Sequence, residues 1–174
     1  MSMIPVRVGG LAFDERSKSP VVLLQEIEGN RVLPIWIGQT EAHAIQMELQ
    51  GKKYQRPLTH DLLMKLVGIL NGKISRVVIT DLKDTTFFAS IYLDAGNGPV
   101  PVDARPSDSI AIALRARVPI FVVDRVLEQS AQPAPSKESA PDGQKSPEEK
   151  AEELRRYLEE MNPEDFGKWN PEDL

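Results

Sequence analysis

An internal repeat with an offset of 67 residues limits the possible folds of this chain more than any other feature. Two segments align without gaps at that offset, so that Gly29-Asn30 falls on Gly96-Asn97 and Thr40-Glu41 falls on Ser107-Asp108. Each copy contains a turn, a strand, a short loop and a helix start that carries an acidic residue. A duplicated hairpin–helix unit is therefore predicted, although turns and helix caps favour these residue types in any protein.

Hydrophobic patterns between turn signals place the other elements. We expect strands at 4–13, 21–28, 32–37, 75–82, 86–94, 100–104 and 118–123, and helices at 40–50, 59–70 and 107–117. The residues Thr40, Thr59 and Ser107 are expected as helix N-caps. This order predicts an α+β domain with a mixed, mostly antiparallel sheet and three packed helices, followed by a C-terminal helix.

Composition divides the chain into three parts. Residues 1–128 are predicted to form the domain, and 129–147 form a flexible linker rich in Pro, Ser, Ala and Lys. Residues 148–174 form an acidic tail in which Leu154 and Leu158 begin a hydrophobic stripe at helical spacing. Because an isolated helix of this length is marginal in water, we expect it to dock on its own assembly or on another protein.

The net charge of −5 is unevenly distributed. Residues 1–130 contain 15 Lys or Arg and 14 Asp or Glu, whereas 131–174 contain 6 and 12. The domain thus lacks the one-sided basic character of proteins that bind nucleic acid mainly through phosphates. Any contact with nucleic acid would have to come from a local basic patch or a metal ion.

The absence of cysteine excludes disulfides, thiolate metal sites and a cysteine nucleophile. This composition is compatible with a reducing cytoplasm. The N-terminus has no basic segment followed by an apolar stretch, and no apolar run reaches the roughly 18 residues that span a bilayer. We therefore expect a cytoplasmic protein without a membrane segment.

The polar segment between Asp103 and Ser109 lies where a strand ends and a helix begins. The free N–H groups of a helix start can bind phosphate, together with Ser107, and Arg105 can add a bidentate contact. Asp103 and Asp108 can supply oxygen ligands to Mg²⁺ or Mn²⁺. Alternatively, Ser107 and Asp108 only stabilise the helix start and Arg105 pairs with Asp103.

A second polar segment runs from Arg56 to Asp61 and also opens a predicted helix. His60 is the one plausible general base, whereas Asp61 can act in catalysis or simply pair with Lys65 at i,i+4. Glu41 corresponds to Asp108 in the repeat, so it either completes a shared acidic site or serves as an ordinary first-turn acid.

Three segments resemble motifs of the bifunctional nuclease domain family: Leu33 to Ile45, Arg56 to Leu62, and Val102 to Ala111. They occur in family order, and the third, with Asp-Ala-Arg-Pro-Ser-Asp, is the most specific. The resemblance covers residues 3–125. It implies a bacterial-type cytosolic domain that self-associates, most simply as a homodimer.

The resemblance also implies hydrolysis of DNA and RNA. The implied catalytic residues are His60, Asp61, Asp103 and Asp108; substrate binding is assigned to Arg56, Arg105 and Ser107, and metal binding to Glu41, Asp103 and Asp108. One hypothesis is a phosphodiesterase assisted by Mg²⁺ or Mn²⁺ and using no organic cofactor. The other is a non-catalytic oligomeric module whose polar cluster binds a phosphate-bearing ligand or braces a subunit interface.

Overall fold

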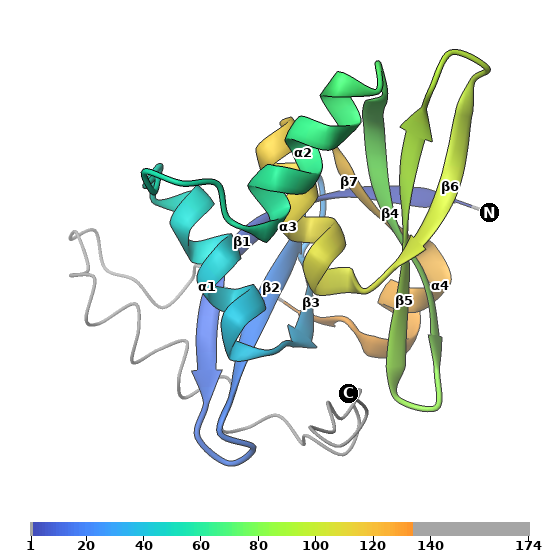
Figure 1. The fold of residues 1–174 in the computed structure, drawn as a ribbon. Helices are drawn as coiled ribbons and strands as arrows, with labels where there is room; N and C mark the ends of the chain where they lie inside the picture. The colour runs from blue at the N-terminus through green and yellow to red at the C-terminus, as the bar shows by residue number, and fades with distance from the viewer. Residues whose placement is uncertain (1, 134–174) are drawn as a thin grey trace.

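The computed structural model of the chain describes residues 2–133 (Figure 1). In chain order, its elements are β1 (Met3–Asp14), β2 (Ser19–Glu26), β3 (Arg31–Trp36), α1 (Gln39–Leu49), α2 (Thr59–Ile69), β4 (Lys73–Lys83), β5 (Thr86–Asp94), β6 (Pro99–Ala104), α3 (Pro106–Ala116), β7 (Ile120–Val123), α4 (Asp124–Ser130) and β8 (Gln132–Pro133). The strands form one sheet in the order β6-β5-β4-β7-β1-β2-β3-β8. Every pair of neighbours is antiparallel except β4 and β7. The predicted α+β class with a mixed, mostly antiparallel sheet is confirmed.

The two halves of the domain have the same order of elements, β1-β2-β3-α1 and β4-β5-β6-α3. Helix α1 begins at Gln39 and α3 begins at Pro106, an offset of 67 residues, and the ends of the helices at Leu49 and Ala116 have the same offset. The repeated spacing is therefore present in the fold. An origin by duplication stays a prediction.

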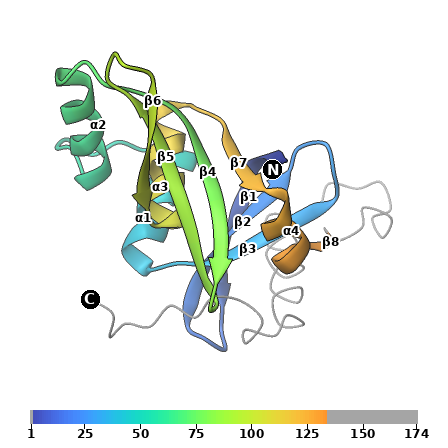
Figure 2. The same ribbon diagram turned by 90° about the vertical axis from the view of Figure 1, so that its right-hand side faces the viewer.

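Helix α3 lies at the centre of the helical layer. It packs against α1, α2, β4 and β5, while α1 also contacts β2. Figure 2 shows α1, α2 and α3 on one side of the β4–β5 hairpin and α4 on the other. Seven of the eleven residues of α3 are buried, among them Ile110 and Ile112. Each such isoleucine contributes about 1.5–3 kcal/mol when fully buried, so α3 anchors the helix starts that carry the polar residues.

The helices begin slightly earlier than the predicted N-caps. The N-cap positions belong to Gly38, Leu58 and Arg105, and none of them makes a side-chain cap hydrogen bond. In each helix the third residue is acidic, and in α2 the carboxylate of Asp61 accepts the backbone N–H of Leu58 at 2.9 Å. An acid at this position stabilises the helix start. Because other residues occupy the N-cap positions, the predicted capping role of Thr40, Thr59 and Ser107 was wrong.

Helix α4 was not predicted. It spans seven residues, too few for a clear helical pattern, and buries Val126 and Leu127. Strand β8 then pairs with β3. Of the predicted linker, residues 129–130 thus lie in α4 and residues 132–133 in β8. The linker from residue 134 onward and the predicted tail helix lie outside the described residues.

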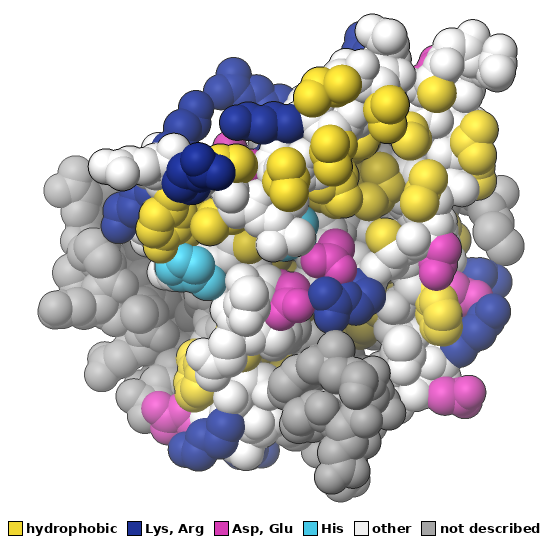
Figure 3. Space-filling model, in the orientation of Figure 1, with side chains coloured by type: hydrophobic (Ala, Val, Ile, Leu, Met, Phe, Trp, Pro, Cys, Tyr) yellow, Lys and Arg dark blue, Asp and Glu magenta, His cyan; other side chains and the backbone are white. Residues whose placement is uncertain are grey.

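Helix α2 contributes no buried residue to the domain. Met64 and Val67 are half-buried against the hydrophobic core, whereas the other large hydrophobic side chains are exposed, among them Ile69 at 75% and Leu70 at 76%. Val100 and Val102 of β6 are also exposed, and Figure 3 shows hydrophobic side chains gathered over α2 and β6. We call this surface the α2–β6 face. A patch of this kind on a water-facing helix is typical of an interaction surface.

No helix within residues 2–133 is long and apolar enough to cross a membrane.

Candidate functional site

Asp108, the third residue of α3, joins two other predicted site residues. Its Oδ1 lies 2.9 Å from Nε2 of His60, the second residue of α2. Its Oδ2 accepts a hydrogen bond of 2.8 Å from Nε of Arg105, the N-cap residue of α3. One carboxylate therefore fixes both a potential base and a potential phosphate-binding cation.

Arg105 extends this cluster to the first helix. Its Nη2 donates to Oε1 of Glu41 in α1 at 3.0 Å, and its side chain remains 56% exposed. The starts of α1 and α3 correspond in the repeat, and the guanidinium of Arg105 joins them by contacting Glu41 and Asp108. Glu41, His60, Arg105 and Asp108 form one connected group, which we call the Asp108 cluster.

A second ion pair lies beside the Asp108 cluster. Nε of Arg115, on α3, donates to Oδ1 of Asp61 at 2.6 Å. The same guanidinium donates to the carbonyl oxygens of Ala111 and Ala44 at 2.9 and 3.3 Å, and the side chain is only 7% exposed. Arg115 therefore ties α1, α2 and α3 together, and the predicted pairing of Asp61 with Lys65 was wrong.

These contacts favour the charged form of each acid. The hydrogen bond from His60, together with Arg105, holds the pKa of Asp108 below its usual range despite partial burial. Burial opposes the ionisation of Asp61, but hydrogen bonds from Arg115 and from the N–H of Leu58 outweigh it and lower its pKa. Hydrogen bonding to Asp108 raises the pKa of Arg105.

Three predicted site residues do not join the Asp108 cluster. Asp103 is exposed on β6, and its side chain has no hydrogen bond or ion pair to any of residues 2–133. The predicted alternative pairing of Arg105 with Asp103 was therefore wrong. Arg56 is exposed in the loop before α2. Ser107 is buried at the second position of α3, which leaves little of it for a substrate to contact.

The residues predicted to hold a metal do not form a coordination site as they are arranged. Glu41 and Asp108 are both paired with the guanidinium of Arg105, which lies between them. In the described part of the chain, no group of three His, Asp or Glu residues could hold a metal ion. Binding of Mg²⁺ or Mn²⁺ therefore stays a prediction.

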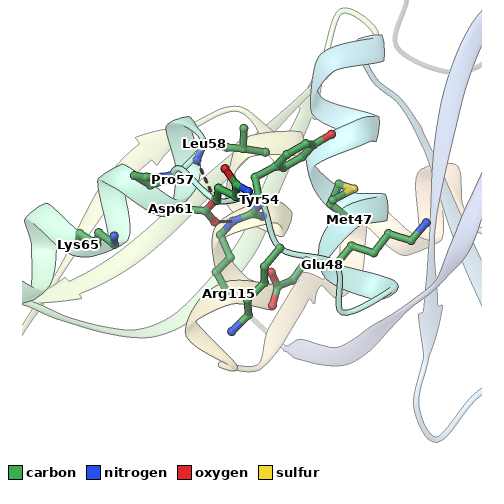
Figure 4. A pocket seen from close by; sticks show the side chains of 11 residues that line it. Met47, Glu48, Tyr54, Pro57, Leu58, Asp61, Lys65 and Arg115 are labelled. Atoms are coloured by element: carbon green, nitrogen blue, oxygen red, sulfur yellow. Dashed lines mark hydrogen bonds and ion pairs between the residues drawn. The ribbon is translucent and has the colours of Figure 1, made fainter.

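A pocket of about 280 Å³ adjoins the Asp108 cluster through the Asp61–Arg115 pair (Figure 4). It lies between α1, the loop at 50–58 and α2, and Tyr54 lines it together with three lysines. In the view of Figure 4, Tyr54 lies between Met47 of α1 and Asp61 of α2. The pocket is a recess of the size of one nucleotide or a similar small group.

The arrangement of His60 and Asp108 can support general base chemistry. A carboxylate on one ring nitrogen orients an imidazole and stabilises its protonated form, while the other nitrogen can accept a proton. Nδ1 of His60 has no hydrogen-bond partner in the described region. The side chain is 13% exposed, so part of the ring can be reached from solvent.

Sequence reasoning missed Arg115 and the pocket. Arg115 follows Asp108 by seven residues, so the two lie on the same face of a helix, and this spacing could have linked them. The run Lys52-Lys53-Tyr54 combines charge with an aromatic ring, which could have indicated the local basic patch. Neither signal shows by itself that the loop and α3 meet.

Comparison with known proteins identifies a matching family and several similar chains. The family model of the bifunctional nuclease domain matches residues 22–135. An uncharacterized protein of Mycobacterium tuberculosis is 42% identical over 161 residues, which is 92% of this chain and 96% of that protein. "Bifunctional nuclease 1" of Oryza sativa subsp. japonica is 27% identical over 71% of this chain but only 39% of its own length. "Bifunctional nuclease 1" of Arabidopsis thaliana is 27% identical over 66% of this chain and 36% of its own length.

Proposed function

Because the chain belongs to the bifunctional nuclease domain family, we propose that it is a nuclease whose reaction centre is the Asp108 cluster. The observation that carries this proposal is the double contact of Asp108, which holds His60 with one oxygen and Arg105 with the other. The substrates we propose are DNA and RNA, in keeping with the names of the plant relatives.

In the proposed reaction, Nδ1 of His60 takes a proton from a water molecule. The resulting hydroxide attacks phosphorus, a new P–O bond forms, and the bond to the leaving oxygen breaks. The leaving oxygen takes a proton from solvent. Asp108 acts as a positioning residue, because its Oδ1 keeps the ring oriented and stabilises the imidazolium that forms.

Arg105 is proposed to stabilise the charge that develops on the phosphate. Its Nε and Nη2 donate to Asp108 and Glu41, whereas Nη1 has no hydrogen bond to any residue that the structure describes. Ion pairs on two sides fix the guanidinium, so it needs little reorganisation when substrate arrives. Mg²⁺ or Mn²⁺ held by Glu41, Asp103 and Asp108 would displace Arg105 from the two acids and would itself supply positive charge at the phosphate.

The proposal is tested by cleavage assays of wild type, His60→Gln and Arg105→Lys on single- and double-stranded DNA and on RNA. Each substrate is tested with Mg²⁺, Mn²⁺ or EDTA. We expect His60→Gln to lower kcat about 100-fold or more, because loss of a general base has effects of this size. Arg105→Lys keeps the positive charge but loses the planar guanidinium that donates to two partners at once. We therefore expect it to lower kcat about tenfold or more.

Asp124→Asn is the matched control, because Asp124 also pairs with an arginine, Arg31, but lies outside the Asp108 cluster. It should cleave like wild type. Equal activity in wild type and His60→Gln would point to a contaminating nuclease and contradict the proposal.

A second function, a non-catalytic oligomeric module, is favoured by the α2–β6 face. We propose that a second copy of this chain covers it. The stripe Leu62, Leu66, Ile69 and Leu70 has no charged residue, so two copies present matching apolar surfaces, whereas the acidic tail would bring carboxylates onto it. Pro99 and Pro101 lack N–H donors on β6, which favours side-chain packing over strand pairing at this edge.

A further inference from the structure

The Asp108 cluster needs help to attract an anionic substrate. Glu41 and Asp108 carry two negative charges, whereas Arg105 carries one positive charge, so the cluster has a net charge of −1 when His60 is neutral. A phosphate would therefore gain little from long-range attraction to the cluster itself. The attraction has to come from cations nearby.

The pocket beside the cluster supplies such cations. Lys52, Lys53 and Lys65 line it, and Glu48 is the one acid of its lining that has no ion pair with another described residue. The pair Asp61–Arg115 contributes no net charge, so three lysines against one glutamate leave the pocket with +2. Arg56 adds a further exposed cation in the same loop, and Figure 3 shows basic side chains gathered there.

The pocket also presents an aromatic ring. Tyr54 is 53% exposed although it lines the recess. Its hydroxyl lies 3.1 Å from Nε2 of His43 on α1, which fixes the ring against the helix. An exposed ring of this kind, held in place among lysines, is the combination by which proteins stack unpaired bases and contact the adjoining phosphates.

We propose that this pocket binds one unpaired nucleotide of a single-stranded nucleic acid next to the reaction centre. This proposal rests on the proposed function, which gives nucleic acid as the ligand, and it adds that the bound form is a single strand. A base enters a recess of about 280 Å³ only when it is free of its partner strand, so a duplex cannot use the Tyr54 ring. Lys52, Lys53 and Lys65 would contact phosphates, and Asp61 lies one residue after His60, which places the bound strand beside the cluster.

The test is fluorescence anisotropy with a labelled 15-nucleotide single strand and the matching duplex, in EDTA and over a range of salt concentrations. The full chain is used, and gels confirm that the probe stays intact. For Lys52→Ala/Lys53→Ala we expect Kd to rise about tenfold and the slope of log K against log salt to shrink by about 1.4, since each charge removed contributes about 0.7 on single strands. Tyr54→Leu should weaken single-strand binding at least fivefold, whereas Tyr54→Phe, which keeps the ring and loses only the hydroxyl contact with His43, should weaken it less.

Arg7→Ala/Lys73→Ala is the matched control, because both side chains are exposed and neither lines the pocket. It should leave the salt slope unchanged. All variants should unfold within about 2 °C of wild type, because substitutions of surface residues have small effects on stability.

An unchanged slope in Lys52→Ala/Lys53→Ala, equal affinity for duplex and single strand, or normal binding by Tyr54→Leu would overturn the proposal. A chain that binds single strands in this way but does not cleave them would refute only the catalytic function. A chain that cleaves with unchanged KM in Lys52→Ala/Lys53→Ala would refute only the pocket.

Discussion

At the scale of single residues, Arg115 shows how a buried charge can hold three helices in place. Its guanidinium contacts the carboxylate of Asp61 on α2 and the carbonyl oxygens of Ala44 on α1 and Ala111 on α3. Because the side chain is almost fully covered, removal leaves these acceptors without their donor in a site that water reaches poorly.

We therefore expect Arg115→Met to destabilise the domain by about 2 kcal/mol, below the value for a fully buried pair because Asp61 is partly exposed. The measurement is urea unfolding followed by circular dichroism. Arg125→Met is the control, since Arg125 pairs with Asp81 in a more exposed position and should cost about 0.5 kcal/mol. Equal decreases in the free energy of unfolding in the two variants would show that the burial of Arg115 does not add to stability.

At the scale of elements, α2 is held by its first turn and by Met64 and Val67, while the rest of its hydrophobic side stays exposed. His60 and Asp61 bind residues of α3, while the α2–β6 face remains uncovered in the described structure. A helix fixed in this way can present its apolar residues to a second copy without any change in its own position.

If a second copy covers this face, light scattering after size-exclusion chromatography should give about twice the chain mass of 19.4 kDa. Leu66→Asp/Leu70→Asp should shift the protein to the monomer, because a charge in an apolar interface loses its hydration. Ile27→Asp is the control, since Ile27 is exposed outside this face. A monomeric wild type, or a dimer that survives Leu66→Asp/Leu70→Asp, would exclude this role for α2.

The sequence predicted most elements but not how their ends meet. Periodicity and turn residues located the three long helices and the two halves of the sheet, because these signals are local. The contact of Arg105 with Glu41 joins residues 64 positions apart, and that of Arg115 with Asp61 joins residues 54 apart. Such pairs depend on the packing of α1 and α2 against α3, about which a local pattern contains no information.

The exact starts of the helices were also not predicted correctly, although they depend on residues close together in the sequence. Thr40, Thr59 and Ser107 are good N-cap residue types, yet an acid at the third helical position and Pro106 at the first position of α3 set the observed starts. The predicted metal ligands were chosen by residue type, and the structure brings only Glu41 and Asp108 of them together, through an arginine.

At the scale of the whole molecule, ionised acids in several parts of the fold contribute to stability. Asp14 is buried, which opposes ionisation, but hydrogen bonds from Ser17, Trp36 and the backbone outweigh this and lower its pKa. The pKa values of Asp61 and Asp108 are also lowered. A lowered folded-state pKa contributes stability that is present above the unfolded value and is lost as pH falls through the folded value.

We therefore expect Tm to be steady near neutral pH and to fall as pH drops below about 4, the ordinary range of an aspartate. Asp14→Asn should lower Tm at neutral pH and make its fall below about pH 4 shallower, since one of the titrating groups is gone. Scanning calorimetry from about pH 2 to 7 measures both effects. A fall in Tm that is as steep in Asp14→Asn as in wild type would show that Asp14 takes no part in it.

The pH dependence of kcat/KM on a single-stranded substrate tests the role of the Asp108 cluster most directly. With His60 as the base, wild type and His60→Gln should differ in the shape of their pH profiles as well as in height, because the variant has no imidazole to take the proton from water. Asp108→Asn keeps the imidazole but should lower kcat/KM, because the carboxylate that orients the ring through Nε2 is lost. A pH profile of the same shape and height in His60→Gln as in wild type would contradict the assignment of His60 as the base.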